Sequence, residues 1–336
     1  MNLPDLDALE AGVRRCERAW LGRAITVVES DHPAHLQHAQ TLLTRLLPDT
    51  GRAVRVGISG VPGVGKSTFI DALGMHLVEA GHRVAVLAVD PTSGRSGGSI
   101  LGDKTRMARL SRRQESFIRP SPSRGALGGV ARKTRESVLV CEAAGHDVVL
   151  VETVGVGQSE TEVAGMVDCF LVLMLPNAGD ELQGIKRGIV ELADLIAVNK
   201  ADGDHVTVAR QARLHYERAL HYLRPAHAEW TPEVSCVSAK TGDGIAALWE
   251  RVEAHHDALS ATGALDRMRA EQAVRWMWHA VESELVDRFR SHPAVRAARD
   301  GLEAEVRAGR EPATQAATEL LRRFREAAEA EPTRQG

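Results

Sequence analysis

The chain has 336 residues, of which 43% are hydrophobic and 26% charged, and its formal net charge at pH 7 is −3. This composition is typical of a globular protein, and the near-neutral charge excludes a global electrostatic attraction to nucleic acid or to a membrane surface. The length exceeds that of a usual single domain, so we expect one large domain with smaller additions.

The sequence carries no signal for a membrane or a secretory pathway. No apolar run approaches the roughly 20 residues that a membrane-spanning helix needs. Residues Met1–Arg15 mix acidic with apolar residues and lack a signal-peptide core. The cysteines stand far apart, without metal-site or redox spacing, and are expected to be small buried residues: Cys16, Cys141, Cys169 and Cys236. We therefore expect a cytoplasmic protein that does not associate with membranes.

The first fifty residues are predicted to form a helical extension, which we assign to residues 1–50. Apolar residues recur at spacings of three and four from Leu6 to Trp20, which places them on one helical face. A second helix is predicted from Pro33 to Leu47, before a Pro-Asp break.

Residues 51–258 show the pattern of an α/β domain. Short, nearly continuous apolar runs are bounded by Gly, Asp or Pro, as in strands that are buried on both faces of a parallel sheet. These runs are Val54–Ile58, Val84–Val89, Val148–Val151, Phe170–Leu175, Leu195–Val198 and Val234–Val237. Helical stretches such as Ser67–Glu79 and Val206–Leu220 separate them. The alternation predicts a doubly wound, mostly parallel sheet.

Two parts of the chain depart from this alternation. The stretch from Pro91 to His146 is too long for a simple crossover, so it is expected to hold helices of its own and a mobile loop around Ser93–Gly102. The strands stop after about Leu259. Residues 259–336 are predicted to be a helical arm with one apolar stripe, formed by Val274, Trp278, Val281, Leu285 and Phe289.

The segment Gly60–Ser67 matches G-x-x-x-x-G-K-[ST] directly after a predicted strand and before a predicted helix. Such a loop turns backbone N–H groups toward a phosphate at a helix N-terminus, which predicts a P-loop NTPase. Lys66 is expected to reach the β- and γ-phosphates and Ser67 to hold Mg²⁺. The remaining predicted phosphate contacts come from Gly63, Val64, Gly65 and Thr68.

A second motif, Asn199-Lys-Ala-Asp202, follows the predicted strand Leu195–Val198. A carboxylate at Asp202 can accept both the ring N–H and the exocyclic amine of guanine, a donor pair that adenine lacks. The stem of Lys200 can lie over the ring face. A second guanine loop is predicted at Ser238, Ala239 and Lys240. Together these residues predict a site for GTP and GDP.

Acidic residues follow two further strands, where the γ-phosphate is expected. Glu152 is a candidate Mg²⁺ ligand, although most GTPases have Asp there, and the N–H of Gly155 could contact the γ-phosphate. Asp90 is a candidate for orienting the attacking water or a metal-bound water, and Asp103 for the Mg²⁺ shell. The alternative for each acid is a helix N-cap. Gln158 fits a switch loop better than a water-positioning role.

The motifs together closely resemble those of the MeaB/ArgK family of GTPase chaperones of adenosylcobalamin-dependent methylmalonyl-CoA mutase. The resemblance spans roughly residues 30–255 and rests on Gly60–Ser67, Asp90-Pro-Thr-Ser-Gly, Gly98–Asp103, Glu152–Glu160 and Asn199–Asp202. It implies a homodimer joined through the C-terminal arm and a role in gating cofactor loading of the mutase or protecting it. It also implies that Asp103 and Glu152 belong to the Mg²⁺ shell and that Asp90 is a catalytic acid, beside Lys66.

Within this resemblance we predict a switch at Asn177–Arg187, a polar segment punctuated by Gly after a fully apolar strand. It would touch the partner through Asp180, Gln183 or Lys186. The alternative is an ordinary loop and helix start. No arginine finger can be assigned, although Arg95, Arg106 and Arg109 are candidates, so intrinsic hydrolysis is expected to be slow.

The segment Lys104–Arg135 holds ten Lys or Arg residues and one acid, Glu115. Phosphate steering, an acidic partner and nucleic acid compete as explanations, and nucleic acid ranks last because Phe117 is the only aromatic residue there. Solvated helix faces would account for about half of the charges.

Two other function classes remain open. A metallochaperone GTPase would need Cys or His clusters, and His255-His256 is better explained as a solvated helix end. A kinase linked to amino-acid transport would need a second pocket for an acceptor.

Overall fold

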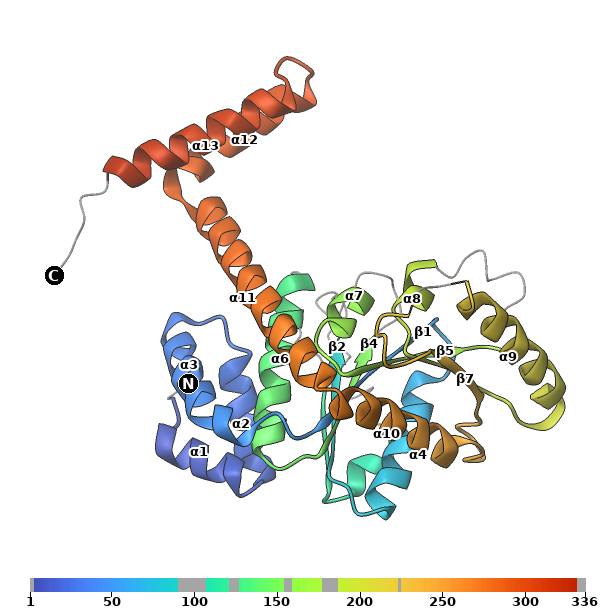
Figure 1. The fold of residues 1–336 in the computed structure, drawn as a ribbon. Helices are drawn as coiled ribbons and strands as arrows, with labels where there is room; N and C mark the ends of the chain where they lie inside the picture. The colour runs from blue at the N-terminus through green and yellow to red at the C-terminus, as the bar shows by residue number, and fades with distance from the viewer. Residues whose placement is uncertain are drawn as a thin grey trace. The chain divides into compact units, whose positions relative to one another are not determined.

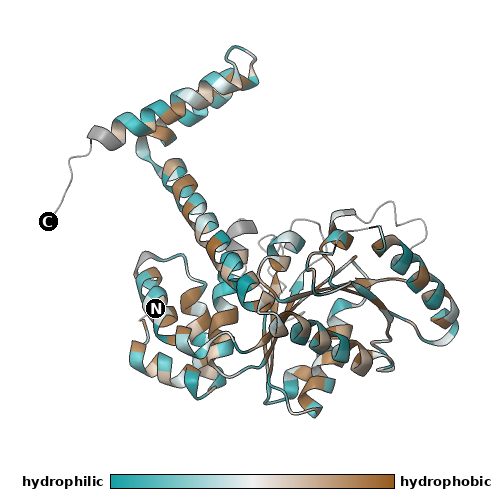
Figure 2. Cartoon of the chain, in the orientation of Figure 1, coloured by the Kyte–Doolittle hydropathy of each residue, from teal (hydrophilic) through white to brown (hydrophobic). Residues whose placement is uncertain are grey.

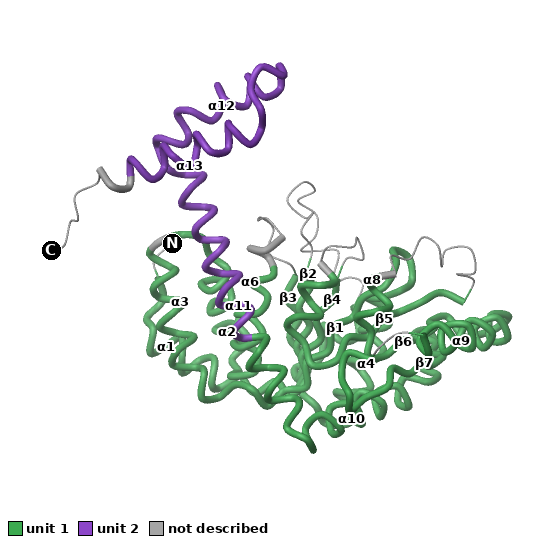
Figure 3. The backbone as a smooth tube through the Cα atoms, turned by 45° about the horizontal axis from the view of Figure 1, so that its top comes forward, with its two compact units in different colours: residues 1–272 green, residues 273–336 purple. Residues whose placement is uncertain are grey.

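The computed structural model describes residues 3–89, 107–120, 127–153, 159–176, 187–222 and 225–330. The chain divides into two compact units, Met1–Gln272 and Ala273–Gly336 (Figure 3). The first unit holds the sheet and the N-terminal helices, and the second is helical.

The centre of the first unit is a parallel sheet with the strand order β3-β2-β4-β1-β5-β6-β7 (Figure 1). Strand β1 lies between β4 and β5, with Val56 opposite Leu150 on one side and Cys169 on the other. The strands are β1 (Val54–Gly60), β2 (Val84–Val89), β3 (Ser116–Arg119), β4 (Val148–Thr153), β5 (Cys169–Met174), β6 (Leu195–Val198) and β7 (Glu233–Cys236). Because all of them run in the same direction, their carboxyl ends meet at one edge of the sheet.

Helices cover both faces of this sheet. Helices α4 and α10 pack against each other on one face, and α6, α7, α8 and α9 lie on the other (Figure 1). Their bounds are α4 (Lys66–Glu79), α6 (Leu127–Ala143), α7 (Ser159–Ala164), α8 (Arg187–Glu191), α9 (Val206–Leu220) and α10 (Ile245–Ala261). The strands in the middle of the sheet are therefore mostly hydrophobic, while polar residues lie on the outer sides of the helices (Figure 2). The doubly wound parallel sheet predicted from the sequence is confirmed.

All six strands predicted from apolar runs are present, within two residues at either end. A seventh, β3, was not predicted. It lies at the sheet edge beside β2. Only Phe117 and Ile118 are apolar among its four residues, and an apolar run of two residues is too short to predict a strand. The stretch from Pro91 to His146 also contains the predicted helical structure, as the short 3-10 helix Leu110–Arg112 and as α6. The loop expected at Ser93–Gly102 lies outside the described residues.

The N-terminal residues form three helices, not the two that were predicted: α1 (Leu6–Arg14), α2 (Arg18–Val28) and α3 (Pro33–Leu46). The single helical face from Leu6 to Trp20 was wrong, because the chain breaks at Cys16, whose φ is +55°. After this turn the indole of Trp20 lies against Gly12, where an added Cβ would stand 2.3 Å from Cγ of the ring. The reversal buries Leu9 and Val13 completely.

Helices α1, α2 and α3 pack against α6, and ion pairs fix them there. Lys133 of α6 is only 4% exposed, and its Nζ lies 2.7 Å from Asp31. Arg119, at the end of β3, pairs with Glu29, the residue that follows α2. Several charges of the basic segment thus serve internal ion pairs rather than solvated faces.

Glu136 of α6 provides a test of this packing by pH. Burial raises the pKa of Glu136 to about 7, against opposing effects of Arg132 and Lys133. The folded chain therefore holds a proton that the unfolded chain releases above about pH 4.5. The resulting destabilisation is absent below that pH, grows as the pH rises, and is complete above about 7. Glu136→Gln is expected to raise the free energy of unfolding by about 1–2 kcal/mol at pH 8 and to change it little at pH 4.5.

Urea denaturation at the two pH values measures this effect. Glu253→Gln on α10, an exposed position, is the matched control and should show no such dependence. Parallel stability profiles for the parent chain and Glu136→Gln would contradict the interpretation.

The second unit contains the distal part of α11 (Ala264–Ser291), followed by α12 (Pro293–Arg307) and α13 (Ala313–Ala330). Helix α11 ends just before His292-Pro293, as predicted. The imidazole of His292 accepts a hydrogen bond from the N–H of Ala294 at 3.3 Å and caps α12. Helices α12 and α13 pack together, and Phe324 lies against the rings of Phe289 and His292.

Three smaller expectations concern the cysteines, His255 and the membrane. The four cysteines form no disulfide, but only Cys141 and Cys169 are buried. His255 is not at a solvated helix end: α10 continues past it to Ala261, and His255 is fully buried beside Trp230. Among the helices of the described residues, none is both long and apolar enough to cross a membrane.

Candidate functional site

The predicted phosphate loop lies at the carboxyl end of the central strand, β1, and leads directly into α4. Gly63 and Gly65 have φ values of +81° and +95°, a region that residues with a side chain rarely adopt. Gly60 also has positive φ, and an added Cβ would stand 2.5 Å from the carbonyl oxygen of Leu173. These glycines let the loop curl at the N-terminus of α4, where unpaired N–H groups attract an anion.

Lys66 begins α4 and folds back over the loop. It is 9% exposed, and its Nζ donates to the carbonyl oxygens of Gly60 at 2.6 Å and Val61 at 3.4 Å. Burial lowers the pKa of Lys66, and the negative charges of Glu152 and Glu160 oppose that shift. The ammonium group is thus held against the loop, at the position where phosphate oxygens are expected.

Ser67 and Glu152 meet at the same edge, although 85 residues separate them in the chain. The Ser67 hydroxyl donates to Oε1 of Glu152 at 3.0 Å. A hydroxyl and a carboxylate so close together are hard oxygen donors of the kind that Mg²⁺ prefers. Within the described ranges, however, His, Cys, Asp and Glu side chains form no group of three or more that could hold a metal ion.

Asn199 connects the three loops of the site. Its side-chain amide donates to the carbonyl oxygen of Val64 at 2.9 Å and accepts from the N–H of Ala239 at 3.1 Å. It is 1% exposed, so these bonds are shielded from water. Lys200, in left-handed conformation with φ +62°, extends over the phosphate loop to the carbonyl oxygen of Gly63 at 2.8 Å. The motif after β6, which was predicted to bind the base, therefore also holds the phosphate loop in place.

Asp202 is the residue predicted to select guanine. Its Oδ1 accepts a hydrogen bond from the Ser238 hydroxyl at 2.9 Å, which fixes the orientation of the carboxylate. Ser238 and Ala239 are buried, whereas Lys240 is exposed. The structure thus brings both predicted guanine loops together at the ends of β6 and β7.

Several predicted site residues lie outside the described residues, and the structure adds nothing about them: Asp90, Arg95, Asp103, Arg106, Gly155, Gln158 and residues 177–186. Thr68 is described and is exposed on the first turn of α4. Arg109 is held by Asp71 of α4, with Nε 2.7 Å from Oδ2.

Two features of the site escaped sequence reasoning. The amide of Asn199 acts as a bridge, which its position in the motif did not indicate. Glu160 lies in the first turn of α7 with only 1% of its surface exposed, close enough for its charge to affect Lys66. No spacing rule singles out this carboxylate, because its proximity to Lys66 arises only when β4 lies next to β1.

Residues 21–294 match the family described as methylmalonyl-CoA mutase-associated GTPase MeaB. The chain is 52% identical to GTPase ArgK of Escherichia coli over 275 residues, covering 82% of this chain and 83% of that protein. It is 46% identical to the mouse methylmalonic aciduria type A homolog, mitochondrial, over 330 residues, covering 95% and 80%.

Among solved structures, one described as LAO/AO transport system kinase is 39% identical and superposes with a TM-score of 0.76. It covers 97% of this chain and 99% of that one. The match spans the sheet, the site and the helical extensions at both termini. The chain is therefore a GTPase that belongs to the family of methylmalonyl-CoA mutase-associated GTPases represented by MeaB.

Proposed function

We propose that this GTPase is a chaperone of an adenosylcobalamin-dependent methylmalonyl-CoA mutase, and that it gates cofactor loading of the mutase or protects it. The observation that carries the proposal is the family match, which covers residues 21–294 and bears the mutase in its description. The mouse relative, whose name refers to methylmalonic aciduria, supports the same client.

The site residues fit GTP hydrolysis with Mg²⁺. Lys66 would neutralise charge on the β- and γ-phosphates, and Asp202 would read the guanine base. Ser67 and Glu152, with their oxygens 3.0 Å apart, would hold Mg²⁺ together with Asp90 and Asp103. The ion supplies positive charge that stabilises the transferring phosphoryl group. Asp90 would orient the attacking water, in line with the bond that breaks.

A hydrolysis rate that depends on the partner follows from this assignment. Arg109, one of the three candidate arginine fingers, is paired with Asp71 of α4. An arginine supplied by a partner accelerates related GTPases by about 10³–10⁵-fold. We therefore infer a slow intrinsic rate that the mutase raises.

Cofactor loading tests the chaperone role directly. Apo-mutase is mixed with adenosylcobalamin, with and without the chain, in the presence of GTP, GDP or a non-hydrolysable GTP analogue. Binding of the cobalamin is followed by its absorbance. A loading rate or yield that depends on which nucleotide is bound supports gating. Identical loading in every nucleotide state, together with unchanged mutase inactivation during turnover, would contradict both parts of the proposal.

We further propose that the chain forms a homodimer through the arm of residues 259–336. Large apolar side chains are exposed on α11: Val274, Met277, Trp278, Val281, Leu285 and Val286. Trp278 and Leu285 are each 58% exposed, so water covers a stripe that a second copy could bury. The double change Trp278→Glu, Leu285→Glu is expected to yield monomers in light scattering after size exclusion. Leu214→Glu, at an exposed apolar position on α9, should leave the dimer intact.

The solved relative described as a transport system kinase favours a second candidate, a kinase linked to transport. Incubation with γ-labelled GTP and candidate amino acids separates the two functions. Label that appears only as inorganic phosphate supports the GTPase chaperone, and label on an amino acid supports the kinase.

A further inference from the structure

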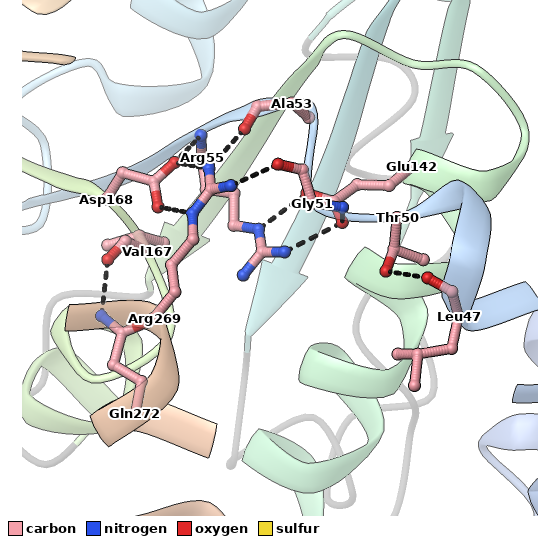
Figure 4. A network of polar contacts seen from close by, with 10 residues as sticks. All are labelled: Leu47, Thr50, Gly51, Ala53, Arg55, Glu142, Val167, Asp168, Arg269 and Gln272. Carbon is pink, nitrogen blue, oxygen red and sulfur yellow. Dashed lines mark hydrogen bonds and ion pairs between the residues drawn. The ribbon is translucent and has the colours of Figure 1, made fainter. Parts of the chain in front are cut away.

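Arg269 lies near the start of α11, at the amino ends of the strands (Figure 4). Its side chain binds two loops, the one that precedes β1 and the one between α7 and β5. Its Nη1 donates to the carbonyl oxygen of Gly51 at 2.5 Å and its Nη2 to that of Ala53 at 2.7 Å. Nε and Nη2 also donate to the two carboxylate oxygens of Asp168, at 2.8 and 2.6 Å. One turn further along α11, Gln272 donates to the carbonyl oxygen of Val167 at 2.8 Å. We call these six residues the Arg269 clamp.

A second ion pair supports the clamp from the other side. Asp168 also accepts the backbone N–H of Arg55 at 2.8 Å. The guanidinium group of Arg55 donates twice to Glu142, at 2.7 and 2.9 Å, and Glu142 in turn accepts the N–H of Gly51 at 2.9 Å. The side chains of Asp168 and Glu142 are 0% and 1% exposed. Each buried charge is therefore paired and hydrogen-bonded.

Both connections held by the clamp lead to the nucleotide edge. Gly51 and Ala53 precede β1, the strand that ends in the phosphate loop. Val167 and Asp168 lie between α7 and β5, so they fix the chain just after α7. The other end of α7 carries Glu160, whose charge affects Lys66. A helix of six residues spans only about 9 Å, so a shift at one end reaches the other.

Stability alone is a weak reason for this arrangement. Apolar residues of similar volume can often replace a buried ion pair without loss of stability. The best-documented role of buried ion pairs is to select one geometry over its alternatives. Arginine suits that role here because its planar fork donates along fixed directions to three acceptor groups at once. Lysine, with one rotatable ammonium group, cannot reproduce this pattern.

We propose that Arg269 is a positioning residue that couples α11 to the nucleotide site, acting through Asp168 and α7. The inference rests on the proposed GTPase chaperone function and adds the path by which the nucleotide state reaches the C-terminal helix. Arg269 holds the chain that follows α7 at Asp168, and the first turn of the same helix carries Glu160, whose charge acts on Lys66.

Hydrogen exchange of the full-length chain tests the coupling. Amides of residues 264–272 are compared between the GDP-bound state and the state with a non-hydrolysable GTP analogue. In the parent chain we expect exchange rates there to differ by about 3-fold or more between the two states. Arg269→Met should reduce that difference to less than about 1.5-fold while the Kd for GDP stays within about 3-fold of the parent value.

Arg267→Met is the matched control, because Arg267 lies two residues away on α11 with 63% of its side chain exposed. It should keep the full nucleotide-dependent difference. Arg269→Lys, a milder change, should at least halve the difference and decides the matter if Arg269→Met does not fold. A difference that persists in the Arg269 variants overturns the proposal, as does its absence in the parent chain. Failure of the parent chain to bind guanine nucleotides would instead contradict the proposed function itself.

Discussion

Replacing Lys66 by alanine is expected to lower the turnover number for GTP by about 10²–10³-fold, the usual cost of removing one group that stabilises developing charge. Lys66 is 9% exposed, and its ammonium group lies against the phosphate loop, with Nζ 2.6 Å from the carbonyl oxygen of Gly60. In this water-poor position its charge acts strongly on phosphate oxygens. Single-turnover hydrolysis at saturating GTP measures the effect on the chemical step.

Lys133→Ala is the control for the loss of a buried lysine. Lys133 is 4% exposed and pairs with Asp31, in the connection between α2 and α3, and not with the phosphate loop. Its replacement should lower the free energy of unfolding but leave hydrolysis within about 2-fold of the parent rate. If Lys66→Ala hydrolysed GTP as fast as Lys133→Ala, the assigned role of Lys66 would be wrong.

Asp202→Asn is expected to change which purine the protein accepts. Guanine offers two donors to the Asp202 carboxylate, whereas xanthine offers one N–H and one carbonyl oxygen. An amide can accept from the N–H and donate to that carbonyl, and it meets guanine with one mismatched pair. Hydrogen bonds to charged groups contribute about 1.5–3 kcal/mol, so affinity for GTP should fall roughly 10–100-fold while affinity for XTP rises above it.

Displacement of a fluorescent nucleotide by GTP, XTP and ATP measures this change. The carboxylate is already oriented by the Ser238 hydroxyl at 2.9 Å, and an amide oxygen can accept the same bond. Asp243→Asn is the control, because Asp243 is exposed and bonds to Thr241 within the same loop. Unchanged preference for GTP in Asp202→Asn would place the guanine-reading group elsewhere.

The parts of this structure that sequence reasoning predicted share a local signal. The phosphate loop has a fixed spacing, and its positive-φ glycines, Gly63 and Gly65, stand where the motif requires them. Strands buried on both faces are apolar along their length, so β1, β2 and β4 were recognisable from composition alone. The convergence of Ser67 with Glu152 followed from the rule that parallel strands end at one edge.

The parts that escaped prediction depend on contacts between distant segments. The break at Cys16 interrupts a regular apolar pattern, and it brings the half-buried indole of Trp20 against Gly12. His255 has the sequence context of a helix end but packs beside Trp230 once α10 lies against the sheet. The Arg269 clamp joins residues more than 100 positions apart in the sequence. The periodicity of apolar residues cannot predict contacts of this kind.

We propose that the chain hydrolyses GTP at a rate that a mutase partner controls. The most direct test is steady-state phosphate release by the purified chain with GTP, alone and with methylmalonyl-CoA mutase, and with ATP as the control nucleotide. We expect slow release from GTP, acceleration by the mutase, and negligible release from ATP. Release from GTP that the mutase leaves unchanged, or a preference for ATP, would contradict the account.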